Sequence, residues 1–136
     1  MTARGNNRAA IYHDDDDRGL FVFLVHRTAA ILDWQVLLWC LMTNHFHLLI
    51  ETKTETLAQG MHRINSRFAH AVNERHGRTG HVFERRYASR VIESETQLEN
   101  TSRYIGHNPV AAGLCEDARD WPWIGGSLRP AALGHA

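Results

Sequence analysis

Residues Met42–Glu51 read Met-Thr-Asn-His-Phe-His-Leu-Leu-Ile-Glu, and this stretch decides the fold. Its apolar residues favour a β-strand. On a strand, His45 and His47 point to the same face with backbones about 7 Å apart, while Phe46 points into the core. A helix would separate the two imidazoles by about 200°. The stretch therefore predicts a strand presenting a histidine pair, which either binds one metal ion or consists of ordinary strand residues.

The preceding sequence predicts a hairpin and a helix. Trp34–Leu41 is rich in β-forming residues, and Thr43-Asn44 predicts a tight turn in which the asparagine adopts unusual backbone angles. Asp14 suits a helix N-cap, and apolar residues at helical spacing predict a helix over 14–32. The aspartates at 14–17 also allow a metal-binding interpretation, but the cap and the helix dipole explain them more simply.

The following sequence predicts a second helix and two short strands. Apolar residues recur every three or four positions and predict a helix over 55–75. Short strands are expected at His81–Phe83 and Tyr87–Ile92.

A last long helix is predicted to begin at Ser94, its N-cap, with Gln97 as capping-box partner. It should end near His107, because Pro109 disfavours helical geometry in the residue before it. Gly106 lies inside this helix, where glycine costs about 1 kcal/mol relative to alanine. We therefore expect Gly106→Ala to raise stability.

These elements predict an α+β fold: a ferredoxin-like antiparallel sheet with helices packed on one face, plus a C-terminal helix. Thr2–Arg8 provides a short first strand. Residues 1–124 are expected to form a single domain, onto which Trp121-Pro122-Trp123 packs the end of the chain. Residues 125–136 are expected to fray.

Composition indicates one soluble globular domain. The chain has 136 residues, of which 43% are hydrophobic and 22% charged, and this length can bury a core without disulfides. Its two cysteines, Cys40 and Cys115, argue against a disulfide framework and fit the cytoplasm. No signal peptide opens the chain, and the longest apolar run, Val36–Met42, is too short to span a bilayer.

The net charge is zero, but the charges are unevenly distributed. Residues 60–90 contain seven arginines and two acidic residues, whereas the acids gather at 14–17, 93–99 and 116–120. A basic stretch of this kind either binds nucleic-acid phosphates or is a solvated helix face. Because arginine suits bidentate phosphate contacts, the DNA-binding candidates are Arg4, Arg8, Arg63, Arg67, Arg78, Arg85, Arg86 and Arg90.

The last helix adds two polar side chains. Tyr104 and Asn108 are four residues apart and share a helix face, while Leu98 and Ile105 mark the core face. A phenol oxygen can attack phosphorus and conserve the bond energy in a phosphotyrosine. Two imidazoles and an amide oxygen would leave positions open on Mg²⁺ or Mn²⁺ for a phosphate oxygen. Alternatively, Tyr104 is a half-buried helix tyrosine without a catalytic role.

Taken together, these motifs resemble the single-tyrosine HUH transposases, most closely the branch associated with repetitive extragenic palindromes (REP). His45-Phe46-His47 resembles the His-hydrophobic-His core of that family, and Arg103–Leu114 resembles its tyrosine-helix signature. Thr2–Arg8, Gly80–Phe83 and Asp120–Trp123 also match. The resemblance therefore covers nearly the whole chain.

This resemblance implies a ferredoxin-like fold and metal-assisted cleavage and joining of single-stranded DNA with hairpins near the cut. It assigns His45, His47 and Asn108 as ligands of Mg²⁺ or Mn²⁺. It assigns Tyr104 as the nucleophile that is left with a 5′-phosphotyrosine. It also implies a prokaryotic, nucleoid-associated protein that is either a homodimer or a monomer.

The sequence departs from the family pattern in four places. The chain begins late, so we expect a truncated or misassigned start. Thr43 replaces the usual proline of the hairpin turn, and Gly106-His107 replaces a more typical His-Leu. Ala112 stands where an arginine is common, which removes one expected phosphate contact.

The residues leave two other functions open. One is a catalytically decayed or domesticated DNA-binding module, which would bind DNA in a salt-sensitive manner without cleaving it. The other is a small metal-dependent phosphoester hydrolase that uses His45, His47 and an activated water. The hydrolase would not need the Tyr104 hydroxyl.

Overall fold

An antiparallel sheet lies at the centre of the computed structural model, which describes residues 2–6, 11–52, 55–79, 82 and 88–133. Over these residues the sheet has five strands in the order β4-β1-β3-β2-β5. The first four strands with two intervening helices form the ferredoxin-like βαββαβ arrangement, as predicted. The strands are β1 (Thr2–Asn6), β2 (Gln35–Leu41), β3 (His45–Glu51), β4 (Ala88–Arg90) and β5 (Ile124–Gly125).

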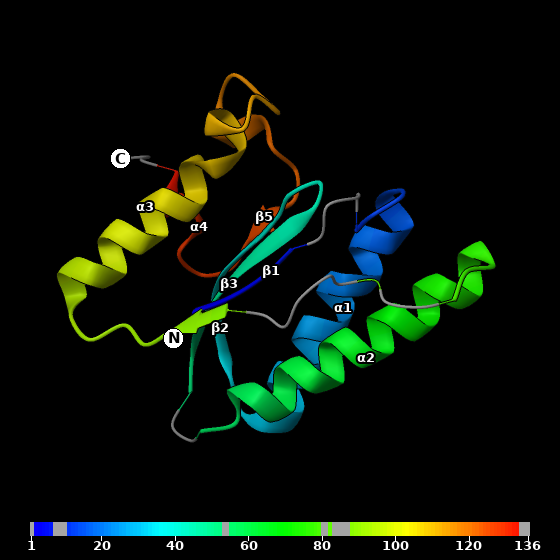
Figure 1. Cartoon of the computed structure of the whole chain (residues 1–136). Coiled ribbons are helices and arrows are strands. Elements are labelled where there is room, and N and C mark those ends of the chain that lie inside the picture. The colour runs from blue at the N-terminus through cyan, green and yellow to red at the C-terminus, as the bar shows by residue number, and fades with distance from the viewer. Residues whose placement is uncertain (1, 7–10, 53–54, 80–81, 83–87, 134–136) are drawn as a thin grey trace.

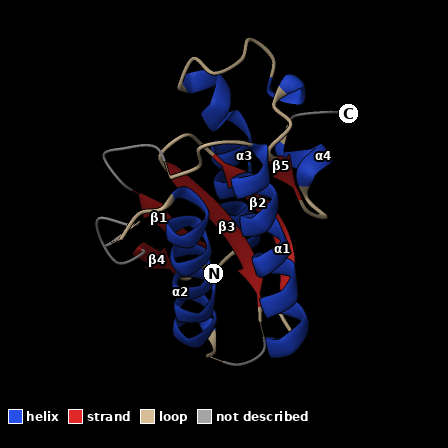
Figure 2. Ribbon diagram, turned by 90° about the vertical axis from the view of Figure 1, so that its right-hand side faces the viewer, coloured by secondary structure: helices blue, strands red, loops and turns tan. Residues whose placement is uncertain are grey.

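Helices cover both faces of this sheet (Figures 1 and 2). α1 (Asp15–Leu32) and α2 (Leu57–His76) pack side by side on one face, and α3 (Glu95–Ala111) crosses the other. The short helices η1 (Ala118–Asp120) and α4 (Arg129–Ala132) contact α3. None of the described helices is long and apolar enough to cross a membrane.

Alternation along β3 divides the core into two layers. Phe46, Leu48 and Ile50 are buried in the cluster formed with α1 and α2. Leu49 is buried in a second cluster, which includes Ile105 of α3. His45 and His47 share the face of Leu49, because side chains two residues apart point the same way. The histidine pair therefore faces the layer that contains α3.

The two predicted helix caps are confirmed. The Asp17 N–H donates to Asp14 Oδ1 at 2.9 Å, where α1 begins. At the start of α3, the Gln97 N–H donates to the Ser94 hydroxyl at 3.1 Å. Gln97 Oε1 accepts a hydrogen bond from the Glu93 N–H at 2.8 Å, which closes the capping arrangement.

Two local predictions are wrong, and a third falls mostly outside the described residues. Among the described non-glycine residues only Asp33 has a positive φ, so Asn44 makes the hairpin turn without unusual angles. α3 continues through Pro109 to Ala111. The proline lies in the last turn, where it removes one backbone hydrogen bond while burying its ring. Of the expected strand at 81–83 only residue 82 is described, and it is not in a strand.

The prediction that residues 125–136 fray is also wrong for residues 125–133. β5 pairs with β2, and the Leu128 N–H donates to the Leu37 carbonyl at 2.8 Å. The tryptophans hold this segment as predicted: Trp121 Nε1 donates to the Leu41 carbonyl at 3.1 Å. Residues 134–136 lie outside the described residues.

Gly106 is a point of close packing between α3 and α4. A Cβ built on Gly106 would lie 2.3 Å from the Ala132 carbonyl oxygen and 2.7 Å from its carbon. These are backbone atoms, which cannot turn aside as a flexible side chain can. The expectation that alanine would stabilise this position is therefore wrong, because the steric cost exceeds the gain in helix propensity.

We predict that Gly106→Ala lowers the melting temperature and reduces the free energy of unfolding by about 1–3 kcal/mol. Gly19→Ala is the matched control, because Gly19 lies in α1 and a Cβ there would meet nothing within 4 Å. Gly19→Ala should raise the free energy of unfolding by about 0.5–1 kcal/mol. Equal shifts for the two variants in thermal unfolding would contradict the packing role of Gly106.

Candidate functional site

The two histidines stand side by side at the centre of the sheet. Their ring centroids are 5.1 Å apart and the rings are nearly perpendicular, at 87°. His47 is 6% exposed and lies opposite Arg4 on β1 and Cys40 on β2. The predicted strand and the shared face of the pair are thus both present.

Helix α3 brings two further side chains to this pair. Asn108 Oδ1 lies 3.4 Å from His45 Nε2. The Tyr104 ring lies 6.0 Å from the His47 ring, measured between centroids. The four residues predicted as the catalytic and metal site therefore converge, although they come from segments about 60 positions apart in the chain.

The surroundings of His45 fit a cation. Asn44 Oδ1 lies 3.0 Å from Nδ1 of this ring, so Nε2 and Nδ1 each face an amide oxygen. A neutral imidazole carries one N–H and can donate to only one of two acceptors. With the proton on Nδ1, the Nε2 lone pair and Asn108 Oδ1 would both be available to a divalent ion. Asn44 Oδ1 would then accept a hydrogen bond from Nδ1–H and fix the orientation of the His45 ring.

The neighbouring Cys40 thiol donates a hydrogen bond to Met42 Sδ at 3.8 Å. Cys40 is buried and lies opposite His47 in the sheet. Burial raises the pKa of the Cys40 thiol to about 12, with a further increase from Cys115. Without a bound metal ion the thiol is therefore protonated at neutral pH.

Tyr104 is accessible to a large substrate. Its side chain is 60% exposed, although its ring edge contacts His47. A groove of about 440 Å³ begins at Tyr104 and runs along α3 to the end of β4. The lining is predominantly polar in residue type and consists of Arg90, Ser94, Thr96, Gln97, Asn100, Thr101 and Tyr104.

The arginine candidates are spread over the molecule. Arg90 lines the groove beside Tyr104, and Arg4 lies opposite His47 in the register of β1 and β3. Arg63 and Arg67 belong to α2 on the opposite face of the sheet, and Arg78 follows this helix. Their role in DNA binding stays a prediction. Arg8, Arg85 and Arg86 lie outside the described residues.

Two contributions to the site were missed in the sequence. The sequence predicts only a turn role for Asn44 and no role for Asn100. Asn100 lies four residues before Tyr104, so the helical spacing that linked Tyr104 to Asn108 also places Asn100 on that face. The role of Asn44 depends on the orientation of the His45 ring, which the sequence does not encode locally.

Comparison with known proteins gives three results. The chain matches the protein family described as "Transposase IS200 like" over residues 2–108. It is 25% identical over 95 residues to a Haemophilus influenzae protein with the provisional name REP-associated tyrosine transposase. This match covers 62% of the chain and 54% of the relative, so the chain spans about half the length of that protein.

The fold is similar to a solved structure of a REP-associated tyrosine transposase bound to a REP hairpin. The TM-score is 0.77 at 16% identity, over 90% of this chain and 73% of the other. Together with the strand order described above, this likeness confirms the predicted fold class.

We predict that Asn108→Asp raises the affinity for Mn²⁺ about tenfold, because a carboxylate adds a charge to the ligand set. Asn100→Asp is the control, since it adds the same charge to α3 about two turns away from Asn108. Isothermal titration calorimetry on both variants and on the unmodified chain measures the difference. Equal gains for the two aspartates would show general charge attraction and no ligand at Asn108.

Proposed function

Because this chain belongs to the IS200-like transposase family, we propose that it is a single-tyrosine transposase that cleaves and rejoins single-stranded DNA. The observation that carries this proposal is the convergence of the β3 and α3 side chains. His47 lies 6.0 Å from Tyr104 between ring centroids, and His45 lies 3.4 Å from Asn108 between Nε2 and Oδ1. This geometry supports a site in which the proposed nucleophile and the proposed metal ligands act on one substrate.

The proposed reaction begins with attack of the Tyr104 phenol oxygen on the phosphorus of the scissile phosphate. The new bond joins this oxygen to phosphorus, and the bond from phosphorus to the 3′ oxygen breaks. The phenol proton is released and the leaving oxygen gains a proton, which leaves a free 3′ hydroxyl and a 5′-phosphotyrosine. Attack by another 3′ hydroxyl reverses these steps and joins two DNA ends.

The proposed cofactor is Mg²⁺ or Mn²⁺, held by His45, His47 and Asn108. When bound, such an ion polarises a phosphate oxygen and stabilises the charge that develops on it. The three ligands are uncharged when both imidazoles are neutral, so they do not repel a phosphate. The short distance between the Tyr104 and His47 rings supports a nucleophile that acts beside this proposed ligand set.

The proposed substrate is single-stranded DNA that carries hairpins. The exposure of Tyr104 supports a large substrate, and the adjoining groove offers Arg90 for a phosphate together with the Gln97 and Asn100 amides. The similar solved structure is of a protein bound to a REP hairpin. We propose hairpin recognition for this chain on that basis, and action at the nucleoid, where such DNA occurs.

We predict that incubation with hairpin-bearing single-stranded DNA and Mn²⁺ gives a covalent protein–DNA adduct that Tyr104→Phe abolishes. Tyr12→Phe is the control: it also removes a phenol hydroxyl and should still give the adduct. The Tyr12 hydroxyl is buried without a hydrogen-bond partner among the described residues, so its removal should leave the fold intact. Tyr87→Phe tests whether the third tyrosine of the chain forms an adduct. Adducts are measured by denaturing gel electrophoresis with end-labelled DNA.

This experiment also separates the two other functions. A DNA-binding module without catalysis would bind the DNA and form no adduct with either metal. A metal-dependent hydrolase would release product equally well with Tyr104→Phe. An adduct that survives Tyr104→Phe would show that another residue is the nucleophile.

We predict that Arg90→Gln weakens binding of single-stranded DNA and makes the slope of log K against log salt less negative by about 0.7, the value for one lost phosphate contact. Arg27→Gln is the matched control, because Arg27 is exposed on α1, on the opposite side of the sheet. Fluorescence anisotropy at several salt concentrations gives the two slopes. Identical slopes for the variants would rule out a specific phosphate contact at Arg90.

A further inference from the structure

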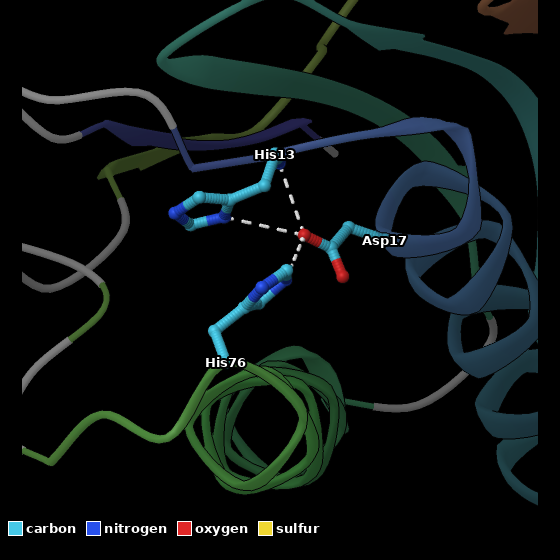
Figure 3. Close-up of side chains that lie close together, drawn as sticks. All are labelled: His13, Asp17 and His76. Atoms are coloured by element: carbon cyan, nitrogen blue, oxygen red, sulfur yellow. Dashed lines mark hydrogen bonds and ion pairs between the residues drawn. The ribbon is translucent and has the colours of Figure 1, made fainter.

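A second group of potential metal ligands lies where α1 begins and α2 ends, on the side of the sheet away from Tyr104. Asp17 Oδ2 is 2.9 Å from His76 Nε2 and 3.2 Å from His13 Nδ1. One ligand atom from each residue lies within 4.8 Å of the other two. Figure 3 shows both imidazole rings directed at this single carboxylate oxygen.

The spacing agrees with tetrahedral coordination. Two ligands about 2.0–2.1 Å from Zn²⁺ at a tetrahedral angle lie about 3.3 Å from each other. The observed distances from Asp17 Oδ2 to the two ring nitrogens are 3.2 and 2.9 Å. The ring centroids are 4.4 Å apart, so the histidines already stand together. The three residues can therefore face one ion together.

The two oxygens of Asp17 have separate partners. Oδ1 accepts a hydrogen bond from Arg75 at 2.6 Å, while Oδ2 accepts one from the His13 backbone N–H at 3.0 Å and faces both rings. These contacts fix the orientation of the carboxylate in advance. Burial alone raises the pKa of Asp17, but the hydrogen bonds from His13, Arg75 and His76 outweigh it, and the pKa lies below its usual value.

Access and charge also suit a cation. The Asp17 side chain is completely buried, whereas the His13 and His76 side chains are 26% and 21% exposed. An ion can therefore approach between the rings from solvent. The aspartates at 14–17 carry four negative charges, and the arginines paired with them, Arg18 and Arg75, carry two positive charges. With neutral imidazoles, this network has a net charge of −2.

The helix cap and dipole, which we used to explain the four aspartates, account for only part of this arrangement. Asp14 caps α1 as predicted. Neither the cap nor the dipole requires a histidine just before α1 and a histidine at the end of α2 to meet at Asp17. Two imidazoles and one carboxylate are a common ligand set for Zn²⁺, with water in the fourth position.

We propose that His13, Asp17 and His76 bind Zn²⁺ and thereby join the start of α1 to the end of α2. The ligand atoms are His13 Nδ1, Asp17 Oδ2 and His76 Nε2. The ion stabilises the helical layer that supports the back of β3 and takes no part in DNA chemistry. This proposal is independent of the function proposed above, because none of its residues belongs to the site on α3.

The test uses the full chain with His45→Ala and His47→Ala, which removes the other histidine pair, after treatment with a chelator. Co²⁺ is the spectroscopic probe, because tetrahedral Co²⁺ has a strong visible absorption. We expect this absorption to saturate at one equivalent and to disappear when Zn²⁺ is added. Zn²⁺ should also raise the melting temperature of the same protein.

Variants of the ligands complete the test. His76→Gln retains a hydrogen-bond donor toward Asp17 but should lose both responses, and His13→Gln should do the same. His70→Gln is the matched control: this histidine lies on α2, its side chain is 82% exposed, and it pairs with Glu74. It should keep both responses. The proposal is overturned if Co²⁺ and Zn²⁺ give no response, or if the responses survive His76→Gln and His13→Gln.

Discussion

The alternation of side chains along β3 is the constraint on which the rest of the molecule depends. Phe46, Leu48 and Ile50 are buried against α1 and α2, so His45 and His47 must face the opposite layer. A shift of register by one residue would turn both imidazoles into the apolar core formed with α1 and α2, and would move Phe46, Leu48 and Ile50 to the face that α3 covers. The energy of core packing thus fixes the orientation of the histidine pair.

The two helical layers of the fold accordingly have different roles. The α1–α2 layer contains most of the large buried side chains, including Phe21 and Phe68, and supports the back of the sheet. The α3 layer has a smaller core around Ile105, and it presents Tyr104 and Asn108 at the sheet. The C-terminal segment contributes to this smaller layer, because α4 packs directly on Gly106. The position of Tyr104, the proposed nucleophile, therefore depends on residues beyond α3.

Features with local causes were predictable from the sequence. The β3 strand, the caps at Asp14 and Ser94, and the shared face of Tyr104 and Asn108 each follow from spacings of a few residues. Their convergence was expected only from the resemblance to a family, since neither spacing nor composition relates β3 to α3.

Features with distant causes were not predictable. The effect of Gly106 depends on the Ala132 carbonyl, which approaches from another helix, and the meeting of His13 with His76 depends on how α1 packs against α2. Such contacts between segments far apart in the chain leave no periodic signal.

The central claim is that β3 and α3 together build one metal pocket beside Tyr104. The most direct measurement is an anomalous difference map from crystals of the chain grown with Mn²⁺. We predict a peak bounded by His45, His47 and Asn108; no density there at saturating Mn²⁺ would contradict the account.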